Sequence, residues 1–232
     1  MSLESIAFIP DGNRRYASKH GLNLAKAYEV GTHRTWDVIQ WVSEYPQIKV
    51  ATFYALSLEN VTRSKTELDV LFRIFEKEAD KILAEEYYKT HDFAIRFLGR
   101  LENFPKNMQE KMNEIQSKSK DYAKKIINVA IGYNGRAEIV DAAKKLAREF
   151  AEKKIDVNDV NEETFRKYLY HDFHDPDMIV RTGYTKRLSG FLTYQSTYSE
   201  LYFLDKFWPE FSKEDLGVAI ASFDEKQRRF GK

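Results

Sequence analysis

The sequence contains no cysteine, which excludes disulfide bonds and thiolate chemistry and suits a reducing compartment. No apolar run approaches the roughly 18 residues of a membrane-spanning helix, and the N-terminus lacks the charged and then apolar pattern of a signal peptide. Lysine and arginine total 37 against 36 acidic residues, so the formal net charge of +1 gives no overall nucleic-acid signature. We therefore expect a cytoplasmic protein that at most touches a membrane from outside and that binds no nucleic acid.

Long flexible connections are also missing. No stretch rich in proline, glycine or serine interrupts the chain, and no internal repeat is visible. A chain of 232 residues can bury a sizeable core, so we expect a single domain over residues 1–232. The nucleotide-binding patterns GxxxxGK(S/T) and GxGxxG are absent as well, which argues against a nucleotide ligand.

The sequence does contain a regular alternation of apolar runs and amphipathic stretches. Strands are predicted at 6–9, 50–56, 93–99, 126–133, 178–183 and 200–204, and helices at 24–44, 66–89, 105–124, 136–152 and 212–229. Strand–helix alternation of this kind favours an α/β fold with a mainly parallel central sheet covered by helices.

The stretch IPDGNRRY at residues 9–16 places polar residues directly after the first predicted strand. Gly12 and Asn13 suit a tight turn, and a helical stretch can begin at Tyr16. A strand, a glycine-containing turn and a helix start leave backbone N–H groups free to bind an anion, and Asp11 could hold a divalent cation. A solvated turn with a helix cap is the alternative for this stretch alone.

Four predicted strands are followed by loops that combine arginine with small polar residues. The loops begin at Asp11, Ser57, Asn134 and Arg181. Because chemistry in open parallel sheets lies at the carboxyl ends of the strands, we expect these loops to form one site. Guanidinium groups suit phosphate oxygens, and carboxylates such as Asp11 and Glu200 suit Mg²⁺. The sequence therefore predicts a site for polyanions and a metal ion.

Several segments resemble, in order, the signature blocks of the cis-prenyltransferases. They read DGNRRYA, YALSLENVTR, IGYNGRAEIVDA, DPDMIVRTG, RLSGFLTYQ, YSELYFLDKFWPEF and RRFG, and the resemblance runs from residue 6 to the C-terminus. The doubled arginine at Arg14 and Arg15 resembles the archaeal and eukaryotic branches. The resemblance implies a dimeric, Mg²⁺-dependent transferase that condenses isopentenyl diphosphate with an allylic prenyl diphosphate. Its product is a longer cis-polyprenyl diphosphate, expected to serve as a lipid glycosyl carrier.

The resemblance also implies roles for individual residues. Asp11 and Asn60 correspond to catalytic residues, and Asp11 and Glu200 to metal ligands. The residues implied for the allylic diphosphate are Gly12, Asn13, Arg14, Arg15, Tyr16, Ser57, Glu59 and Arg63. Those implied for isopentenyl diphosphate are Arg181, Arg187, Ser189, Arg229 and Gly231. The last two belong to a C-terminal motif that, in dimers of the family, reaches over the neighbouring active site.

The sequence departs from the family pattern at several positions. Tyr28 stands where many members have histidine, and Leu24 stands near an expected arginine. Val61 replaces a common tryptophan. The stretch RTGYTKRLSGF, which contains Thr185 and Lys186, lacks the glutamate and the frequent histidine or asparagine of the family. These departures predict that one contact to the allylic diphosphate is missing or replaced and that the metal site differs in detail.

Apolar residues near the predicted site could line a tunnel for the growing product between the sheet and the helices. Leu56, Leu71, Ile74 and Phe75 are the candidates, although most residues of this kind belong to an ordinary core. The segment 171–175, HDFHD, has the composition of a metal site, but a solvated loop is favoured.

Two other functions are open to the chain. One is a non-catalytic partner subunit of the same fold, and the other is a nucleic-acid-binding module that uses the arginine loops. The presence of Asp11 and Asn60 argues against the first, and the scattered basic residues argue against the second.

Overall fold

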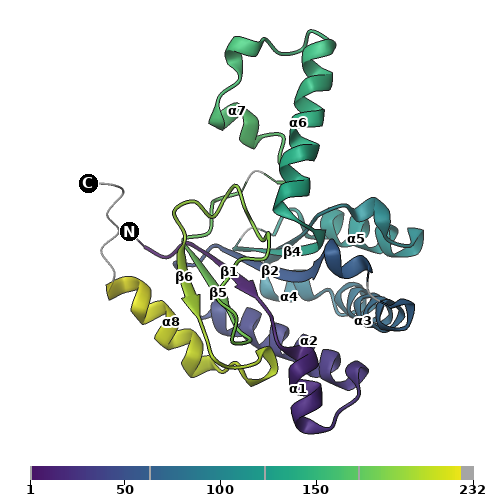
Figure 1. Cartoon of the computed structure of the whole chain (residues 1–232), viewed down its shortest axis with the longest axis vertical. Helices are drawn as coiled ribbons and strands as arrows, with labels where there is room; N and C mark the ends of the chain where they lie inside the picture. The colour runs from purple at the N-terminus through teal and green to yellow at the C-terminus, as the bar shows by residue number, and fades with distance from the viewer. Residues whose placement is uncertain (1, 63, 123, 172, 226–232) are drawn as a thin grey trace.

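Six strands form one sheet in which every described pair is parallel (Figure 1). The computed structural model describes residues 2–62, 64–122, 124–171 and 173–225. The strands are β1 (Ser5–Ile9), β2 (Val50–Ser57), β3 (Phe93–Leu98), β4 (Lys125–Tyr133), β5 (Met178–Arg181) and β6 (Glu200–Phe203). Their order in the sheet is β3-β4-β2-β1-β5-β6. The predicted parallel α/β fold is confirmed.

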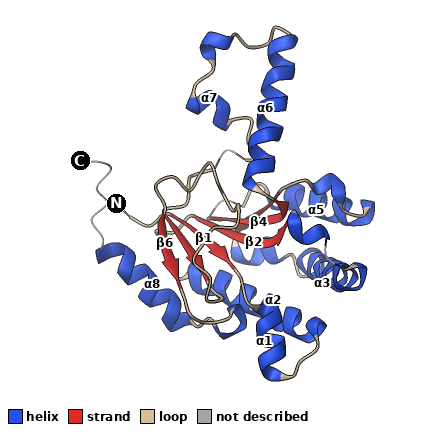
Figure 2. Ribbon diagram, in the orientation of Figure 1, coloured by secondary structure: helices blue, strands red, loops and turns tan. Residues whose placement is uncertain are grey.

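Helices follow most of the strands (Figure 2). They are α1 (Asn13–His20), α2 (Leu24–Ser43), α3 (Lys65–Ala84), α4 (Tyr87–His91), α5 (Lys106–Ser119), α6 (Gly135–Ala151), α7 (Glu162–Arg166) and α8 (Lys213–Glu225). The end of α6 and α7 project away from the sheet (Figure 1). No described helix combines the length and the apolar character needed to cross a bilayer.

Alternate residues of the strands enter two different cores. Phe8 and Phe53 stack at a ring distance of 5.0 Å within the larger core, which includes residues of α2, α3, α5 and α8. Ala7 and Tyr54 belong to the opposite face, where the chain around Phe173 and residues 188–192 covers the sheet. This side-to-side alternation is the period of two that a strand imposes.

The predicted helix at 66–89 is interrupted in the structure. The helix α3 ends at Ala84, Glu86 takes the left-handed conformation with φ 45°, and the short helix α4 follows. The apolar pattern hid this break because no glycine or proline marks it. The predicted helix at 105–124 is also too long, because α5 ends at Ser119 so that the chain can enter β4.

A buried lysine joins β4 to the end of α2. The side chain of Lys125 is 3% exposed, and its Nζ donates hydrogen bonds to the carbonyl oxygens of Tyr45 and Ile48. Burial, aided by the charges of Lys49 and Lys124, lowers the pKa of Lys125 to about 8. The folded protein therefore gives up this proton at a lower pH than the unfolded chain does.

We expect the unfolding free energy of the wild type to rise relative to that of Lys125→Met between pH 8 and pH 10. In that window the unfolded chain binds more protons than the folded chain, so raising the pH favours the fold, by about 2 kcal/mol. Denaturant unfolding of both proteins at several pH values measures the difference, with the exposed Lys120→Met as the control. A difference that stays constant with pH would contradict this interpretation of Lys125.

Candidate active site

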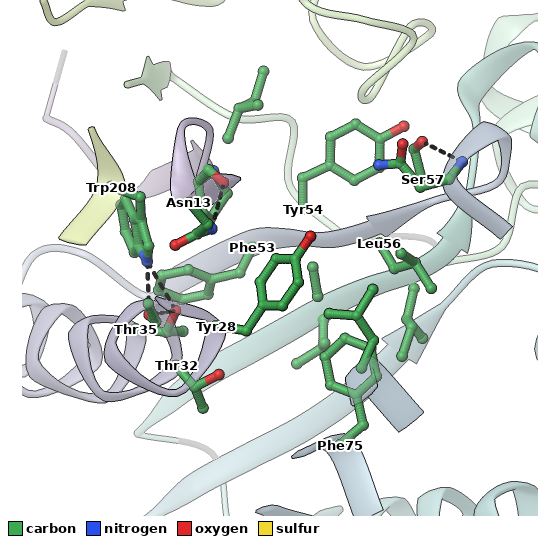
Figure 3. A pocket seen from close by; sticks show the side chains of 18 of the residues that line it. Asn13, Tyr28, Thr32, Thr35, Phe53, Tyr54, Leu56, Ser57, Phe75 and Trp208 are labelled. Carbon is green, nitrogen blue, oxygen red and sulfur yellow. Dashed lines mark hydrogen bonds between the residues drawn. The ribbon is translucent and has the colours of Figure 1, made fainter. Parts of the chain in front are cut away.

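The loops at the carboxyl ends of the strands surround one cavity of about 1310 Å³. Figure 3 shows Tyr28, Phe53, Tyr54, Leu56 and Phe75 around this space, between α2, the sheet and α3. The lining of its polar end includes Asp11, Gly12, Asn13, Arg14, Arg15, Ser57, Glu59, Asn60, Asn134, Arg136, Arg181 and Ser189. All four loops that were predicted to converge contribute to this lining.

Asp11 lies between two arginines at the polar end of the cavity. Its Oδ2 accepts a hydrogen bond from Arg181 Nη2 at 2.8 Å, and its Oδ1 accepts one from Arg15 Nη2 at 3.1 Å. Thr182 fixes the backbone of Asp11, because its Oγ1 contacts both the amide nitrogen at 3.1 Å and the carbonyl oxygen at 2.9 Å. The Asp11 side chain is 31% exposed and the Arg181 side chain only 4%, so a solvent-accessible carboxylate is paired with a buried guanidinium group.

Two glycines adjoin Asp11, Gly12 in the sequence and Gly183 in space, and each position requires glycine. Gly12 has φ 106°, and a Cβ atom there would lie 2.6 Å from Cδ1 of Phe207. Gly183 has φ 91°, and a Cβ atom there would lie 2.9 Å from Cβ and Cγ of Asp11 itself. Side chains at these positions would displace the carboxylate or the turn that carries it.

The helix α1 begins at this turn and presents its N-terminus to the cavity. No side chain among the described residues caps it, and Gly12, Asn13, Arg14 and Arg15 all line the cavity. The first amide groups of a helix lack partners within the helix and carry a partial positive charge, so they suit an anion. The sequence predicted that this helix starts at Tyr16, but α1 begins three residues earlier, at Asn13.

The loop that contains Arg187 and Ser189 is held against the other side of Arg181. The Nη1 atom of Arg181 donates hydrogen bonds to Ser189 Oγ, at 2.9 Å, and to the carbonyl oxygen of Arg187. The Tyr54 hydroxyl donates to the carbonyl oxygen of Tyr133 at 3.1 Å and lies 3.4 Å from that of Ser189. Burial, with the nearby Glu59 charge, raises the pKa of Tyr54, so its hydroxyl stays protonated.

The loops after β2 and β4 meet on the remaining side of the cavity. Glu59 Oε1 accepts a hydrogen bond from Asn134 Nδ2, and Ser57 Oγ accepts one from the amide of Asn60 at 3.2 Å. Asn134 also caps α6, because its Oδ1 accepts from the amides of Arg136 and Ala137. The α6 cap thereby brings the Arg136 side chain to the cavity.

The structure separates some residues that the sequence placed together. Glu200 pairs in register with Met178 at the amino ends of β6 and β5, whereas Arg181 pairs with Phe203 at the carboxyl end beside Asp11. Glu200 therefore lies at the amino ends of the strands, whereas Asp11 lies at their carboxyl ends. No cluster of three or more possible metal ligands occurs among the residues that the structure describes.

Three predicted site residues, Arg63, Arg229 and Gly231, lie outside the described residues. Tyr16 does not line the cavity, and its ring packs on His20 at 4.3 Å. Arg187 stays exposed at the rim, with its Nε 3.3 Å from Ser189 Oγ. Thr182 and Arg136 belong to two of the loops that were predicted to form the site, although the resemblance gave neither residue a role.

The departures from the family pattern have structural counterparts. The Tyr28 hydroxyl donates to Glu67 Oε1 at 2.5 Å, and Glu67 Oε1 lies 4.0 Å from Arg14 Nε. Tyr28 thus links α2 to α3 beside the polar end of the cavity. Thr185 Oγ1 donates to the carbonyl oxygen of Gly183 at 3.2 Å, which stabilises the turn against Asp11.

Beyond the polar end, the cavity wall is mainly apolar, with Thr32, Thr35 and Glu78 among its few polar residues. Leu56, Leu71, Ile74 and Phe75, the candidates for a tunnel, lie in this wall. The other apolar residues of the wall include Ile39, Phe53, Ala79, Ile82, Phe93, Ile95, Phe97, Met108, Met112, Ile127, Val129 and Ile131.

The segment 171–175 had the composition of a metal site. In the structure, Asp175 of this segment forms an ion pair with Arg166 at 2.9 Å, and Asp172 lies outside the described residues.

Comparison with known proteins places this arrangement in context. The family model of undecaprenyl diphosphate synthase matches residues 9–231. Relatives from Pyrobaculum aerophilum and Methanopyrus kandleri are both named tritrans,polycis-undecaprenyl-diphosphate synthase (geranylgeranyl-diphosphate specific). The first is 41% identical over 98% of this chain and 95% of its own length. The second is 39% identical over 99% of this chain and 84% of its own length.

Solved structures agree with the sequence relatives. Lavandulyl diphosphate synthase from Lavandula x intermedia, in complex with dimethylallyl diphosphate, superposes with a TM-score of 0.93 at 30% identity, over 98% of this chain and 97% of that chain. A probable undecaprenyl diphosphate synthase from Campylobacter jejuni gives a TM-score of 0.82 at 29% identity, over all of both chains.

Proposed function

Because the chain belongs to the undecaprenyl diphosphate synthase family of prenyltransferases, we propose that it elongates geranylgeranyl diphosphate with isopentenyl diphosphate into a cis-polyprenyl diphosphate at the cavity around Asp11. The chain is a transferase that condenses isopentenyl diphosphate with an allylic diphosphate, as its relatives are. The choice of starter rests on the names of those relatives. The observation that carries the proposal is the Arg15–Asp11–Arg181 arrangement at the polar end of an apolar cavity.

The two substrates would lie on opposite sides of Asp11. The allylic diphosphate fits the N-terminus of α1 with Arg14 and Arg15, and isopentenyl diphosphate fits Arg181 with Ser189. At an effective dielectric near 20, one close charge pair contributes roughly 4 kcal/mol before desolvation, so several arginines can offset the repulsion between two diphosphates. Holding the isopentenyl double bond against the allylic carbon would supply much of the rate enhancement.

The residues at the polar end fit a magnesium ion that is shared with substrate. Mg²⁺ in proteins commonly takes one or two carboxylates and completes its shell with phosphate oxygens and water. Asp11 offers one partly exposed carboxylate beside the place proposed for the diphosphates. When bound there, the metal would withdraw charge from the leaving diphosphate. Glu200 of the same chain lies too far along the sheet to share it.

Asn60 would orient the reacting groups and would not itself act as the base. A neutral amide accepts a proton poorly, so a diphosphate oxygen or Asp11 would take the proton that leaves the new isoprene unit. The loop that carries Asn60 is positioned by Ser57 Oγ, which accepts the Asn60 amide hydrogen bond.

The apolar part of the cavity would hold the growing chain as a tunnel. Its volume of about 1310 Å³ exceeds the roughly 300–1,000 Å³ of ordinary small-ligand pockets. Burying each five-carbon unit contributes roughly 4 kcal/mol, at about 0.8 per CH₂. A long apolar tail with a diphosphate head suits a lipid glycosyl carrier, and with it a cytoplasmic enzyme in peripheral contact with a membrane.

A second copy of the chain would cover the outer edge of the sheet. The strand β6 has a described neighbour on one side only, and Leu201 beside this edge is 39% exposed. Tyr198, just before the strand, is 68% exposed. An open strand edge with apolar side chains favours pairing with another chain, which supports the expected homodimer.

We expect Leu201→Lys to convert the dimer into a monomer at micromolar concentration, because it would place two like charges in the shared interface. Sedimentation velocity measures the change. Val218→Lys is the matched control, since Val218 is 53% exposed on α8 and its charge would leave the dimer intact. A wild-type protein that sediments as a monomer would refute the dimer.

The proposed activity is tested with labelled isopentenyl diphosphate, Mg²⁺ and geranyl, farnesyl or geranylgeranyl diphosphate as starters. We expect the purified chain to incorporate several units, fastest with the geranylgeranyl starter. Incorporation that prefers a shorter starter would overturn the proposed starter alone. No incorporation from any starter would instead favour the non-catalytic partner subunit.

A further inference from the structure

One acidic side chain lies in the mainly apolar part of the cavity, whose wall also includes the hydroxyl residues Thr32 and Thr35. Glu78 of α3 lines the cavity, and its Oε2 accepts a hydrogen bond from the indole Nε1 of Trp36 on α2 at 2.7 Å. Among the described residues Glu78 forms no ion pair. The pair therefore places one carboxylate, held by an uncharged donor, between the two helices that flank the cavity.

The Trp36–Glu78 pair is half-buried and lies away from the polar end of the cavity. Near the polar end, the same two helices are joined by Tyr28 and Glu67, which is also close to Arg14. From Glu67 to Glu78, α3 rises about 16 Å, at 1.5 Å per residue. The neighbours Ala79 and Ile82 of α3 belong to the core that holds Phe93, the first residue of β3. Glu78 is thus far from the residues proposed to bind the diphosphates.

Aromatic rings hold Trp36 in place. Its ring packs on Tyr87 of α4 at 4.6 Å, and Tyr87 stacks on His91 at 4.0 Å. His91 in turn packs on Phe93 at 5.5 Å. The row of rings runs from α2 through α4 to β3, so the indole N–H that holds Glu78 is fixed by three elements.

We propose that the Trp36–Glu78 pair limits the length of the product, an inference that rests on the proposed function. Growing carbon units displace water from the cavity wall, which is favourable along apolar side chains. At Glu78 the same displacement would strip water from a carboxylate that no cation neutralises, which is strongly unfavourable. Growth past this level is therefore opposed, and chains of the length that reaches it accumulate.

The experiment compares product lengths of the wild type with those of Glu78→Leu, Glu78→Gln and Asp69→Ala. Leucine keeps the approximate bulk and removes the polarity, whereas glutamine can still accept from Trp36 and removes only the charge. Asp69 is an exposed acid on the same helix, so its variant is the matched control. Labelled products are separated by chain length after the same fraction of substrate is consumed.

We expect Glu78→Leu to lengthen the main product by at least one five-carbon unit and Glu78→Gln to lengthen it less. The rate of the first condensation should change by less than about twofold, because the pair is remote from the diphosphates. Asp69→Ala should match the wild type. Thermal unfolding shows whether each variant is folded. If Glu78→Leu is not folded, the product length of Glu78→Gln tests the proposal.

Folded Glu78 variants with unchanged or shortened products would overturn the inference. Failure of the proposed function would look different, since the wild type itself would then incorporate no label from any starter.

Discussion

Replacing Asp11 with alanine is expected to lower kcat/KM by about 10³-fold. The change removes the partner of two arginines and the carboxylate proposed to hold the metal. Asp11→Asn keeps the shape and loses the charge, so it should lose nearly as much activity. Steady-state kinetics with both substrates measures the loss.

Asp37→Ala is the control for Asp11, because Asp37 is a surface acid that also pairs with an arginine, at 3.1 Å from Arg34. Removing Asp11 leaves the buried Arg181 without its carboxylate, so the unfolding free energy should also fall, by about 1–2 kcal/mol. A folded Asp11→Ala protein with wild-type turnover would refute the assignment of the site.

Arg181→Ala is expected to raise KM for isopentenyl diphosphate and to lower kcat/KM for it by about 10³-fold. Arg181 joins Asp11 to the loop of Ser189, so its loss removes a phosphate-binding group and the support of that loop. Affinity for the allylic starter, measured by calorimetry, should change little, since the starter is proposed to lie on α1. Lysine keeps the charge without the planar fork, so Arg181→Lys should recover part of the loss.

Arg73→Ala provides the matched control for Arg181, because Arg73 is exposed on α3 and its Nε donates a hydrogen bond to the backbone oxygen of Asp69 at 3.1 Å. The assignment of the two substrates to two sides of Asp11 would be wrong if Arg181→Ala weakened starter binding and left KM for isopentenyl diphosphate unchanged.

The sequence was sufficient to predict the layout of the site where local rules apply. Apolar runs that alternate with helices predict a parallel sheet, and the carboxyl ends of its strands must meet at one edge. For that reason the loops beginning at Asp11, Ser57, Asn134 and Arg181 were expected together, and the structure brings them to one cavity.

Glu200 was predicted as a metal ligand from its residue type and the family resemblance. The predicted strand at 200–204 begins at this residue, and in a parallel sheet the first residue of a strand lies away from the carboxyl ends. The register of β6 against β5 confirms that Glu200 lies at the amino ends of the strands. The break after α3 was hidden for another reason, because Glu86 adopts a left-handed conformation that its residue type does not signal.

Long-range pairs were invisible before folding. Nothing in the sequence links Trp36 to Glu78 or Tyr28 to Glu67, since each pair depends on the way α2 packs beside α3. Glu78 follows Phe75 on the same helix and has the spacing of an ordinary solvated acid. Only the structure shows that Glu78 lines the cavity and that its carboxylate accepts a hydrogen bond from Trp36.

The most direct test of the account is the position at which the tail of an allylic diphosphate binds. A geranylgeranyl diphosphate analogue with a photoreactive group at its tail end would be irradiated with the protein, and the labelled peptide identified by mass spectrometry. We predict labelling within 71–82 or 93–97, abolished by excess geranylgeranyl diphosphate. Labelling confined to the outer surface, or not displaced by that competitor, would contradict the claim that this cavity holds the chain.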